Sequence, residues 1–239
     1  MKDTWIKQII IATDGKSNIG GDPVYESKLA KEKGIVVNAI GIIKANESNE
    51  KSLLEIENIA NAGGGMWERS TIEKLGRTMC VMTQKTMNMT IHNVVNEELQ
   101  EILGTNMNGI SPKDRSKIVD YVDKLSENIS LKCCILMDCS SSMVHRMDKG
   151  KESILDLIDS LIGRVGKSEV ALIGFPHGDE YYKVICDFTS DLDLVKKKVN
   201  ELKCGGTTPT AMAIKGAVRL MEDKKEEIVE EGFLRDNIV

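Results

Sequence analysis

Two long runs of this chain are predominantly apolar, and this pattern limits the possible folds more than any other feature. Residues 5–12 are rich in isoleucine, and residues 35–43 read Ile-Val-Val-Asn-Ala-Ile-Gly-Ile-Ile. Strands that are apolar on both faces are typical of parallel sheets, which helices cover on both sides. A third apolar run, 131–137, predicts another such strand in the second half of the chain.

Helical segments separate these strands. The pair Asp22-Pro23, for example, is typical of a helix start, and Gly34 is expected to end that helix. The other predicted elements are helices at 51–60, 149–165, 191–202 and 210–227 and strands at 64–69, 170–175 and 182–188. Because parallel strands are joined by right-handed crossovers, this alternation predicts an α/β fold with a Rossmann-like, doubly wound, mostly parallel sheet.

Residues 91–130 differ from the segments on either side, because they carry helical signals only. Ser111-Pro112 is a good helix start, and an apolar stripe follows it. The stripe consists of Ile118, Val119, Val122 and Leu125. We expect a helical hairpin insert that joins two α/β blocks. Just before it, Ser70 is expected to cap a helix whose methionines, 79, 82, 87 and 89, pack in the core.

Oxygen-bearing side chains occur in three motifs, which all fall at predicted strand-to-helix turns. These motifs are Asp138-x-Ser140-x-Ser142, the Thr-Asp-Gly sequence that contains Asp14, and a Gly-Gly-Thr-Thr-Pro turn that contains Thr208. Ligands of parallel α/β sheets bind beyond the carboxyl ends of the strands. Mg²⁺ takes oxygen ligands and keeps several waters, so hydroxyls and one or two carboxylates are enough to hold it. Sites with hydroxyls and few charges suit Mg²⁺ or Mn²⁺.

Each motif has a simpler explanation when it is taken alone. Asp-x-Ser-x-Ser is also typical of helix caps, and Thr-Asp-Gly is typical of ordinary turns. Gly-Gly-Thr-Thr-Pro is common where a loop leads into a helix. The combination is more specific, because three turns at one sheet edge each present an oxygen ligand. The sequence therefore predicts a divalent-metal site.

Together the motifs resemble the metal-ion-dependent adhesion site (MIDAS) of von Willebrand factor A (vWA) domains. In that family Asp-x-Ser-x-Ser comes first and Thr-Asp-Gly last, whereas here Thr-Asp-Gly opens the chain. The resemblance implies a circularly permuted vWA domain, an arrangement similar to that of a group of bacterial proteins. Residues 1–90 would be the back half, 91–130 the hairpin linker and 131–239 the front half. Permutation preserves a core when the original ends lie close together.

The resemblance also implies a ligand set and a function. The expected metal residues are Asp138, Ser140, Ser142, Thr208 and Asp14. The hydroxyls would bind directly and the aspartates often through water, which leaves one position open for an acidic side chain of a partner protein. Family members place the threonine directly before a proline, which selects Thr208, with Thr207 as the near alternative. We expect an adhesion-type protein-binding module and no enzyme.

Composition agrees with a protein partner in the cytoplasm. The net charge of −5 offers no basic footprint for nucleic acid or an anionic membrane. No apolar run approaches the roughly 20 residues of a membrane span, and the start of the chain lacks the pattern of a signal peptide. The six cysteines are scattered without a C-x-x-C pair, so they are expected to be inert. Cys139 lies inside the metal loop, and its exposure decides whether it is reactive.

Three alternatives stay open. Asp138 could be the nucleophile of a Mg²⁺-dependent phosphatase or phosphotransfer enzyme, but such enzymes need a second acid where Ser140 stands, and neither Lys149 nor Lys203 lies in a matching motif. The two halves could instead pair between chains as a swapped dimer, although the long linker favours closure within a monomer. Lastly, the metal site could be vestigial and the hairpin the binding surface.

Overall fold

The structure is a computed structural model that describes residues 5–43, 50–104 and 109–222. Its centre is a six-stranded sheet with the order β3-β2-β1-β4-β5-β6. The strands are β1 (Trp5–Thr13), β2 (Ile35–Ile42), β3 (Gly64–Ser70), β4 (Ser130–Asp138), β5 (Ser168–Phe175) and β6 (Lys183–Thr189). Only β6 runs antiparallel to its neighbour. The predicted mostly parallel, Rossmann-like sheet is confirmed.

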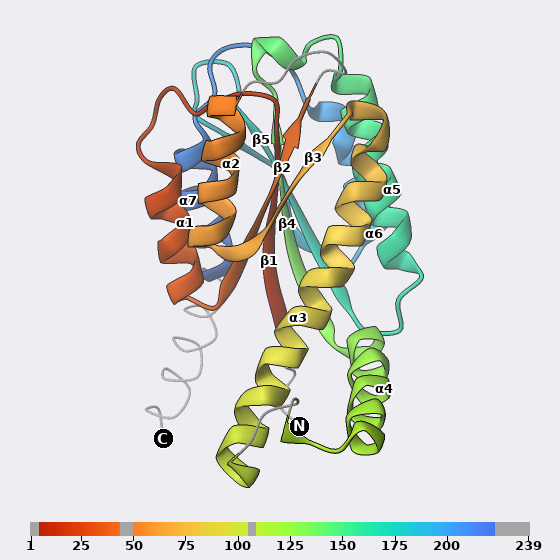
Figure 1. The fold of residues 1–239 in the computed structure, drawn as a ribbon. Coiled ribbons are helices and arrows are strands. Elements are labelled where there is room, and N and C mark those ends of the chain that lie inside the picture. Colours follow the sequence, from red (N-terminus) through yellow and green to blue (C-terminus); the bar gives the residue numbers. More distant parts are fainter. Residues whose placement is uncertain (1–4, 44–49, 105–108, 223–239) are drawn as a thin grey trace, which may run out of the picture.

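Helices cover both faces of the sheet (Figure 1). The helices are α1 (Pro23–Glu32), α2 (Glu50–Ala62), α3 (Leu75–Leu103), α4 (Pro112–Asn128), α5 (Met147–Ile162), α6 (Leu192–Lys198) and α7 (Thr210–Glu222). Helices α1, α2 and α7 pack on one face, and α3, α5 and α6 pack on the other. Helix α4 lies beside the end of α3, beyond the sheet. Two apolar cores result, one on each face, which explains why the strands are apolar on both sides.

The sheet is wound in two directions from its centre. From β1 the chain proceeds outward through β2 to β3, and from β4 it proceeds outward through β5 to β6. Strands β1 and β4 are therefore the neighbours at which the strand order reverses, and Ala12 lies opposite Met137 in their register. Such a reversal leaves a crevice beyond the carboxyl ends of the two strands. Asp14 and Asp138 both lie at this point.

Several local predictions are confirmed by hydrogen bonds. The Asp22 carboxylate caps α1 by accepting from the Val24 N–H at 2.9 Å. The Ser111 hydroxyl caps α4 by accepting from the Asp114 N–H at 3.2 Å. Both helices continue with a proline, whose missing N–H is not needed in the first turn.

Other local predictions are wrong. Ser70 ends β3 instead of capping a helix; its hydroxyl donates to the Thr71 carbonyl, and a short 3-10 helix, Ile72–Lys74, precedes α3. Helix α3 runs without a break through position 90, so the expected boundary at 90/91 falls inside a helix. Residues 77–103 contain no glycine or proline, and Met79, Met82 and Met87 pack in the core. The prediction that Met89 also packs there is wrong, because its side chain lies on the outer side of the helix and is exposed.

The later elements also differ in detail. Helix α6 is shorter than expected and is followed by a 3-10 helix, Val199–Glu201, so the Gly-Gly-Thr-Thr-Pro turn follows helical residues and not a strand. Of the three motifs, only two lie at strand ends. The predicted extension of α7 to residue 227 lies outside the described residues. The division of the chain into two vWA halves and a linker remains a prediction.

The structure also bears on the cysteines and on membrane spans. Cys139 is 1% exposed, and burial raises the pKa of its thiol, so this residue lacks the properties of a reactive cysteine. Across the described ranges, none of the helices has the length and apolar character to cross a membrane.

Candidate metal centre

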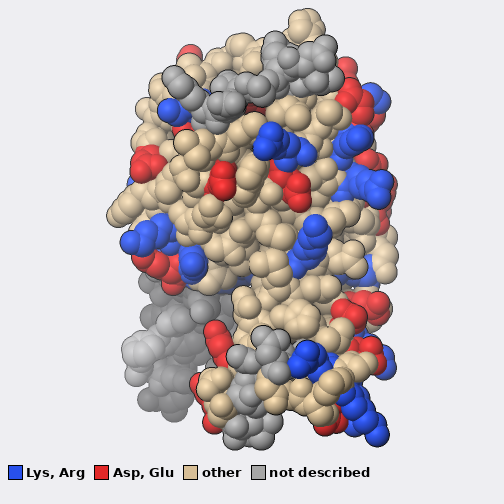
Figure 2. All heavy atoms as spheres, in the orientation of Figure 1, with Lys and Arg blue, Asp and Glu red and all other residues tan. Residues whose placement is uncertain are grey.

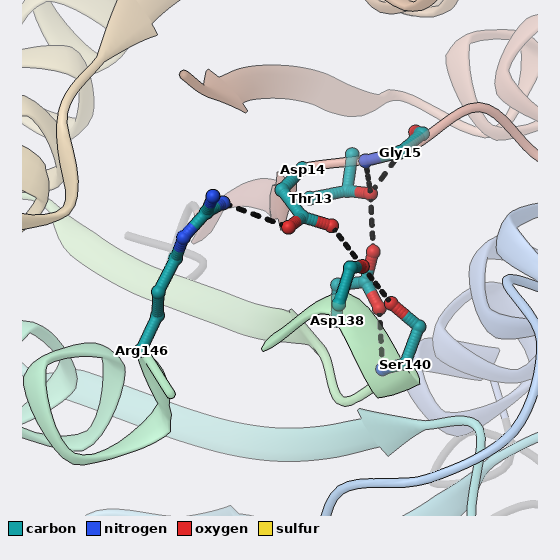
Figure 3. A network of polar contacts seen from close by, with 7 residues as sticks. Thr13, Asp14, Gly15, Asp138, Ser140 and Arg146 are labelled. Carbon is teal, nitrogen blue, oxygen red and sulfur yellow. Dashed lines mark hydrogen bonds and ion pairs between the residues drawn. The ribbon is translucent and has the colours of Figure 1, made fainter. Parts of the chain in front are cut away.

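Two aspartates meet where β1 and β4 end side by side (Figure 3). The Thr13 hydroxyl donates a hydrogen bond of 2.5 Å to Asp138 Oδ2 and thereby connects the two strand ends. The Gly15 N–H donates to the same hydroxyl oxygen at 3.2 Å, which fixes the turn that follows β1. Thr13 and Asp138 are both almost fully buried. The carboxylate of Asp138 thus lies buried at the point where the two strands end.

The loop after β4 brings the two serines to the same place. The Ser140 N–H donates to Asp138 Oδ1 at 2.7 Å, and this bond turns the loop back over the strand end. The hydroxyls of Ser140 and Ser142 share a hydrogen bond of 3.0 Å. The Ser142 hydroxyl also donates to Asp14 Oδ1 at 2.6 Å. Four of the five predicted metal residues therefore form one connected group.

The fifth residue, Thr208, is attached to the turn that follows β1. Its N–H donates to Asn18 Oδ1 at 2.9 Å, and its carbonyl accepts from the Asn18 N–H at 3.1 Å. Thr208 is buried whereas Thr207 is exposed, and the Thr208 hydroxyl lies 3.6 Å from the point where a side chain at Gly15 would begin. This placement favours Thr208 over Thr207, although the hydrogen bonds described for it reach the Asn18 turn and not the serines.

The loop that contains Thr208, the threonine loop, is also hydrogen-bonded to the loop that contains Ser140 and Ser142, the serine loop. The Gly206 N–H donates to the Ser141 hydroxyl at 3.1 Å, and the Gly205 N–H donates to the Cys139 carbonyl at 2.8 Å. Gly205 has a φ of +152° and Gly206 a φ of +86°, and other residues rarely adopt such a backbone conformation. The Gly-Gly turn therefore lets one loop contact both of the others.

Burial dominates the electrostatics of Asp138. The loss of solvent raises the pKa of its carboxyl to about 6, and the nearby charge of Asp14 acts in the same direction. The hydrogen bonds from Thr13 and Ser140 oppose this rise because they stabilise the ionised form. A cation in the crevice would lower the pKa of the Asp138 carboxyl, since it stabilises the ionised carboxylate.

Two further residues belong to this centre and a third, Glu55, lies at its edge against Ser17; the ligand prediction included none of them. Thr13 holds Asp138, as described above. Arg146 forms an ion pair with Asp14, with 2.8 Å between Nη1 and Oδ2, and the two side chains are 15% and 5% exposed. Glu55 of α2 accepts from the Ser17 N–H at 2.6 Å, and burial raises the pKa of its carboxyl. Thr13 lies within the Thr-Asp-Gly motif, but no sequence pattern indicates the other two.

The ligand atoms fit a small, hard cation. Within the described residues, no three histidine, cysteine or acidic side chains group as a metal site, so hydroxyls must supply part of any coordination here. Oxygens of the serines and Asp14 lie 2.6–3.0 Å apart. An octahedral Mg²⁺ with bonds of about 2.1 Å holds adjacent ligands about 3 Å apart, so these oxygens already have a suitable spacing.

Known proteins share both the sequence and the fold. The family described as von Willebrand factor type A domain matches residues 133–231. The uncharacterized protein YabS of Bacillus subtilis (strain 168) is 37% identical over 224 residues, which cover 93% of this chain and 91% of that protein. The crystal structure of an uncharacterized protein from Alicyclobacillus acidocaldarius is 35% identical, with a TM-score of 0.86 over 94% of this chain and 97% of that one.

The family match covers the part of the chain that contains Asp138, Ser140, Ser142 and Thr208. The alignment with YabS extends over nearly the whole length of both chains. The shared sheet, its helices on both faces and these matches lead to one assignment. The chain belongs to the von Willebrand factor A family.

Proposed function

We propose that this protein is a metal-ion-dependent protein-binding module whose divalent cation links it to an acidic side chain of a partner. The observation that carries the proposal is the hydrogen bond between Ser142 and Asp14, which joins the serine loop to the other end of the chain. Domains of this family commonly bind a metal at such a site and use it for protein interaction. The oxygen ligands favour Mg²⁺ or Mn²⁺.

In this proposal the hydroxyls of Ser140, Ser142 and Thr208 hold the metal, and the carboxylates of Asp138 and Asp14 supply the balancing charge, in part through water. The bound cation supplies an electrophile that attracts a carboxylate. The chain's own residues fix the ligands before binding: Thr13 orients Asp138, and the Gly-Gly turn places the threonine loop. Such prior placement lowers the entropic cost of binding.

Burial supports binding over phosphoryl transfer. A nucleophilic aspartate must reach the phosphorus of its substrate, but Asp138 is 0% exposed and both of its oxygens accept hydrogen bonds from the protein. The position two residues later, which is acidic in aspartate-based phosphatases, is Ser140. A role for Asp138 as a buried charge behind the hydroxyls is consistent with this geometry.

The surface is consistent with a protein partner. Figure 2 shows acidic and basic side chains interspersed over the face on which α3 and β3 lie. Neither sign dominates that face, unlike the continuous basic stripe of nucleic-acid-binding proteins. We propose that one chain closes its own sheet, as a monomer.

Calorimetric titration with Mg²⁺ and Mn²⁺ tests the metal site. We expect the wild-type protein to bind either ion, and Asp138→Asn and Asp14→Asn to lose most of the affinity. Asp120→Asn is the matched control, because Asp120 is an exposed acid on α4, at the opposite end of the molecule. Unchanged affinity in either site variant would show that the ligand assignment is wrong. A wild-type protein that binds neither ion would overturn the proposed function.

A further inference from the structure

Arg146 is the cation of the crevice in this structure, and its position needs an explanation. Its guanidinium contacts Asp14, whose other oxygen accepts from Ser142, so both oxygens of that carboxylate are engaged (Figure 3). The side chain is only 15% exposed although it comes from the start of α5. A buried charge of this kind costs free energy unless a partner balances it.

The balance of charge changes when a divalent cation enters. Without metal, the carboxylates of Asp14 and Asp138 and the guanidinium of Arg146 together carry a single net negative charge, which attracts a cation. With a doubly charged ion, the same group carries a single net positive charge. If the arginine were neutral, the metal-loaded group would carry no net charge at all. Arg146 therefore makes the loaded centre positive and able to attract one anion.

We propose that Arg146 determines the anion specificity of the metal-loaded site: it weakens metal binding and strengthens the binding of a carboxylate. This inference rests on the proposed function and assigns a residue role within it. Because two positive groups would face the ligand, the ligand class is an acidic side chain rather than a neutral carbonyl or amide. An Asp or Glu of a partner protein fits this class.

A cavity beside the ion pair supports this role. It has a volume of about 230 Å³, and Asp14, Ser142 and Arg146 line its polar side. Its other wall includes the apolar side chains of Ile42, Leu53 and Ile56 and the hydroxyl of Ser52. Within the described residues this hydroxyl is buried and has no hydrogen-bond partner. A carboxylate in the cavity would accept from Arg146 and Ser52, whereas an amide offers less charge to the guanidinium.

The proposal predicts that one variant changes the affinity for Mn²⁺ and the affinity for a carboxylate in opposite directions. Arg146→Gln removes the positive charge, so the affinity for Mn²⁺ alone is expected to rise on the order of tenfold. The affinity of the Mn²⁺-loaded protein for a carboxylate is expected to fall by a similar factor. A merely structural role for Arg146 would weaken both. Arg146→Lys keeps the charge and is expected to change both affinities much less.

The experiment uses the full chain at pH 8. Mn²⁺ binding is followed by electron paramagnetic resonance. Carboxylate binding at saturating Mn²⁺ is followed by water-proton relaxation, with the peptide acetyl-Gly-Asp-Gly-amide and its Asn counterpart as probes. Arg219→Gln is the matched control, since Arg219 is an exposed arginine of α7. Arg146→Met is a second neutral variant in case Arg146→Gln does not fold.

The outcomes separate the two proposals. A rise in Mn²⁺ affinity with a fall in affinity for the Asp peptide supports the role of Arg146. If the wild type binds Mn²⁺ and both neutral variants change the two affinities in the same direction, or change neither, this inference is wrong and the proposed function stands. If the wild type binds no Mn²⁺, both are overturned.

Discussion

The hydroxyl of Ser142 donates a hydrogen bond of 2.6 Å to the carboxylate of Asp14, across a separation of 128 residues. Neither part of the chain could bring these two side chains together alone, because each residue lies in a loop beyond a different strand. Adjacent pairing of β1 and β4 places the two loops together. The candidate metal centre is thus a product of the sheet order.

Removal of the Ser142 hydroxyl should weaken metal binding while the fold persists. Ser142→Ala loses one ligand atom and the hydrogen bond to Asp14, and we expect Mg²⁺ affinity to fall about tenfold. The loss of stability should be small, about 1 kcal/mol, since the side chain is exposed. Calorimetry and urea unfolding measure the two effects. Ser116→Ala, an exposed serine on α4, is the control; an equal loss of metal affinity there would contradict the assignment.

Thr13→Val should destabilise the fold through Asp138. Valine has nearly the same shape as threonine but cannot donate, so Asp138 Oδ2 loses its partner in a buried place. An unsatisfied buried acceptor costs about 1–3 kcal/mol, measurable by urea unfolding of the metal-free protein. Thr13→Ser retains the hydroxyl and should recover much of the difference. Equal stability of the Val and Ser variants would show that the hydrogen bond contributes little.

Asp138 should make metal-free stability and metal affinity respond to pH in opposite directions. Its pKa is about 6 in the folded protein against an ordinary value of 3.8, so the folded state favours the protonated form. That contribution, on the order of 3 kcal/mol, is present below about pH 4 and is lost as pH rises through 6. Metal binding needs the ionised carboxylate and should therefore strengthen from pH 5 to 7.5.

Thermal unfolding with and without Mg²⁺ measures both effects. The stabilisation by Mg²⁺ should be larger at pH 7.5 than at pH 5. Asp138→Asn does not titrate, and its metal-free stability should lack the part of the pH dependence that the wild type shows between pH 4 and 6. A stabilisation by Mg²⁺ that is the same at pH 5 and pH 7.5 would contradict the role given to Asp138.

Arg164 should hold the C-terminal end of α4 beside the start of β4 without affecting metal affinity. Its Nη2 donates to the carbonyls of Ser126 and Ile129, at 3.0 and 2.8 Å, where α4 leads into β4. Arg164→Met leaves these carbonyls without their donor, and we expect a loss of about 2 kcal/mol in the free energy of unfolding. Mg²⁺ affinity should stay at the wild-type value. A large loss of affinity would mean that α4 is coupled to the metal centre.

The sequence was sufficient for the sheet and for part of the centre, for a physical reason. Strands such as 35–42 are buried on both faces, so burial leaves a continuous apolar signature in the local sequence. The residues Asp138, Ser140 and Asp14 belong to short motifs. Arg146 does not, because its role depends on meeting Asp14 from a loop 132 residues away. A single sequence contains no local pattern that indicates a contact between residues so far apart.

The local errors have the same origin. Ser70 has the chemistry of a helix cap, but pairing with β2 extends the strand through that position, so tertiary contacts override the local preference. The break expected near residue 90 rested on a change in side-chain pattern. Helix α3 continues there because its buried methionines and Ile91 face the same core.

The central place of β1 has a consequence for how the molecule forms. One of its two neighbours, β4, is synthesised about 125 residues later, as the pair Thr13 and Asp138 illustrates. A nascent chain must therefore hold an apolar strand with one edge unpaired until β4 has been made. Long-range pairing of this kind slows folding. The two strand ends that form the candidate metal centre meet only after this pairing, so metal binding there would report that the sheet has closed.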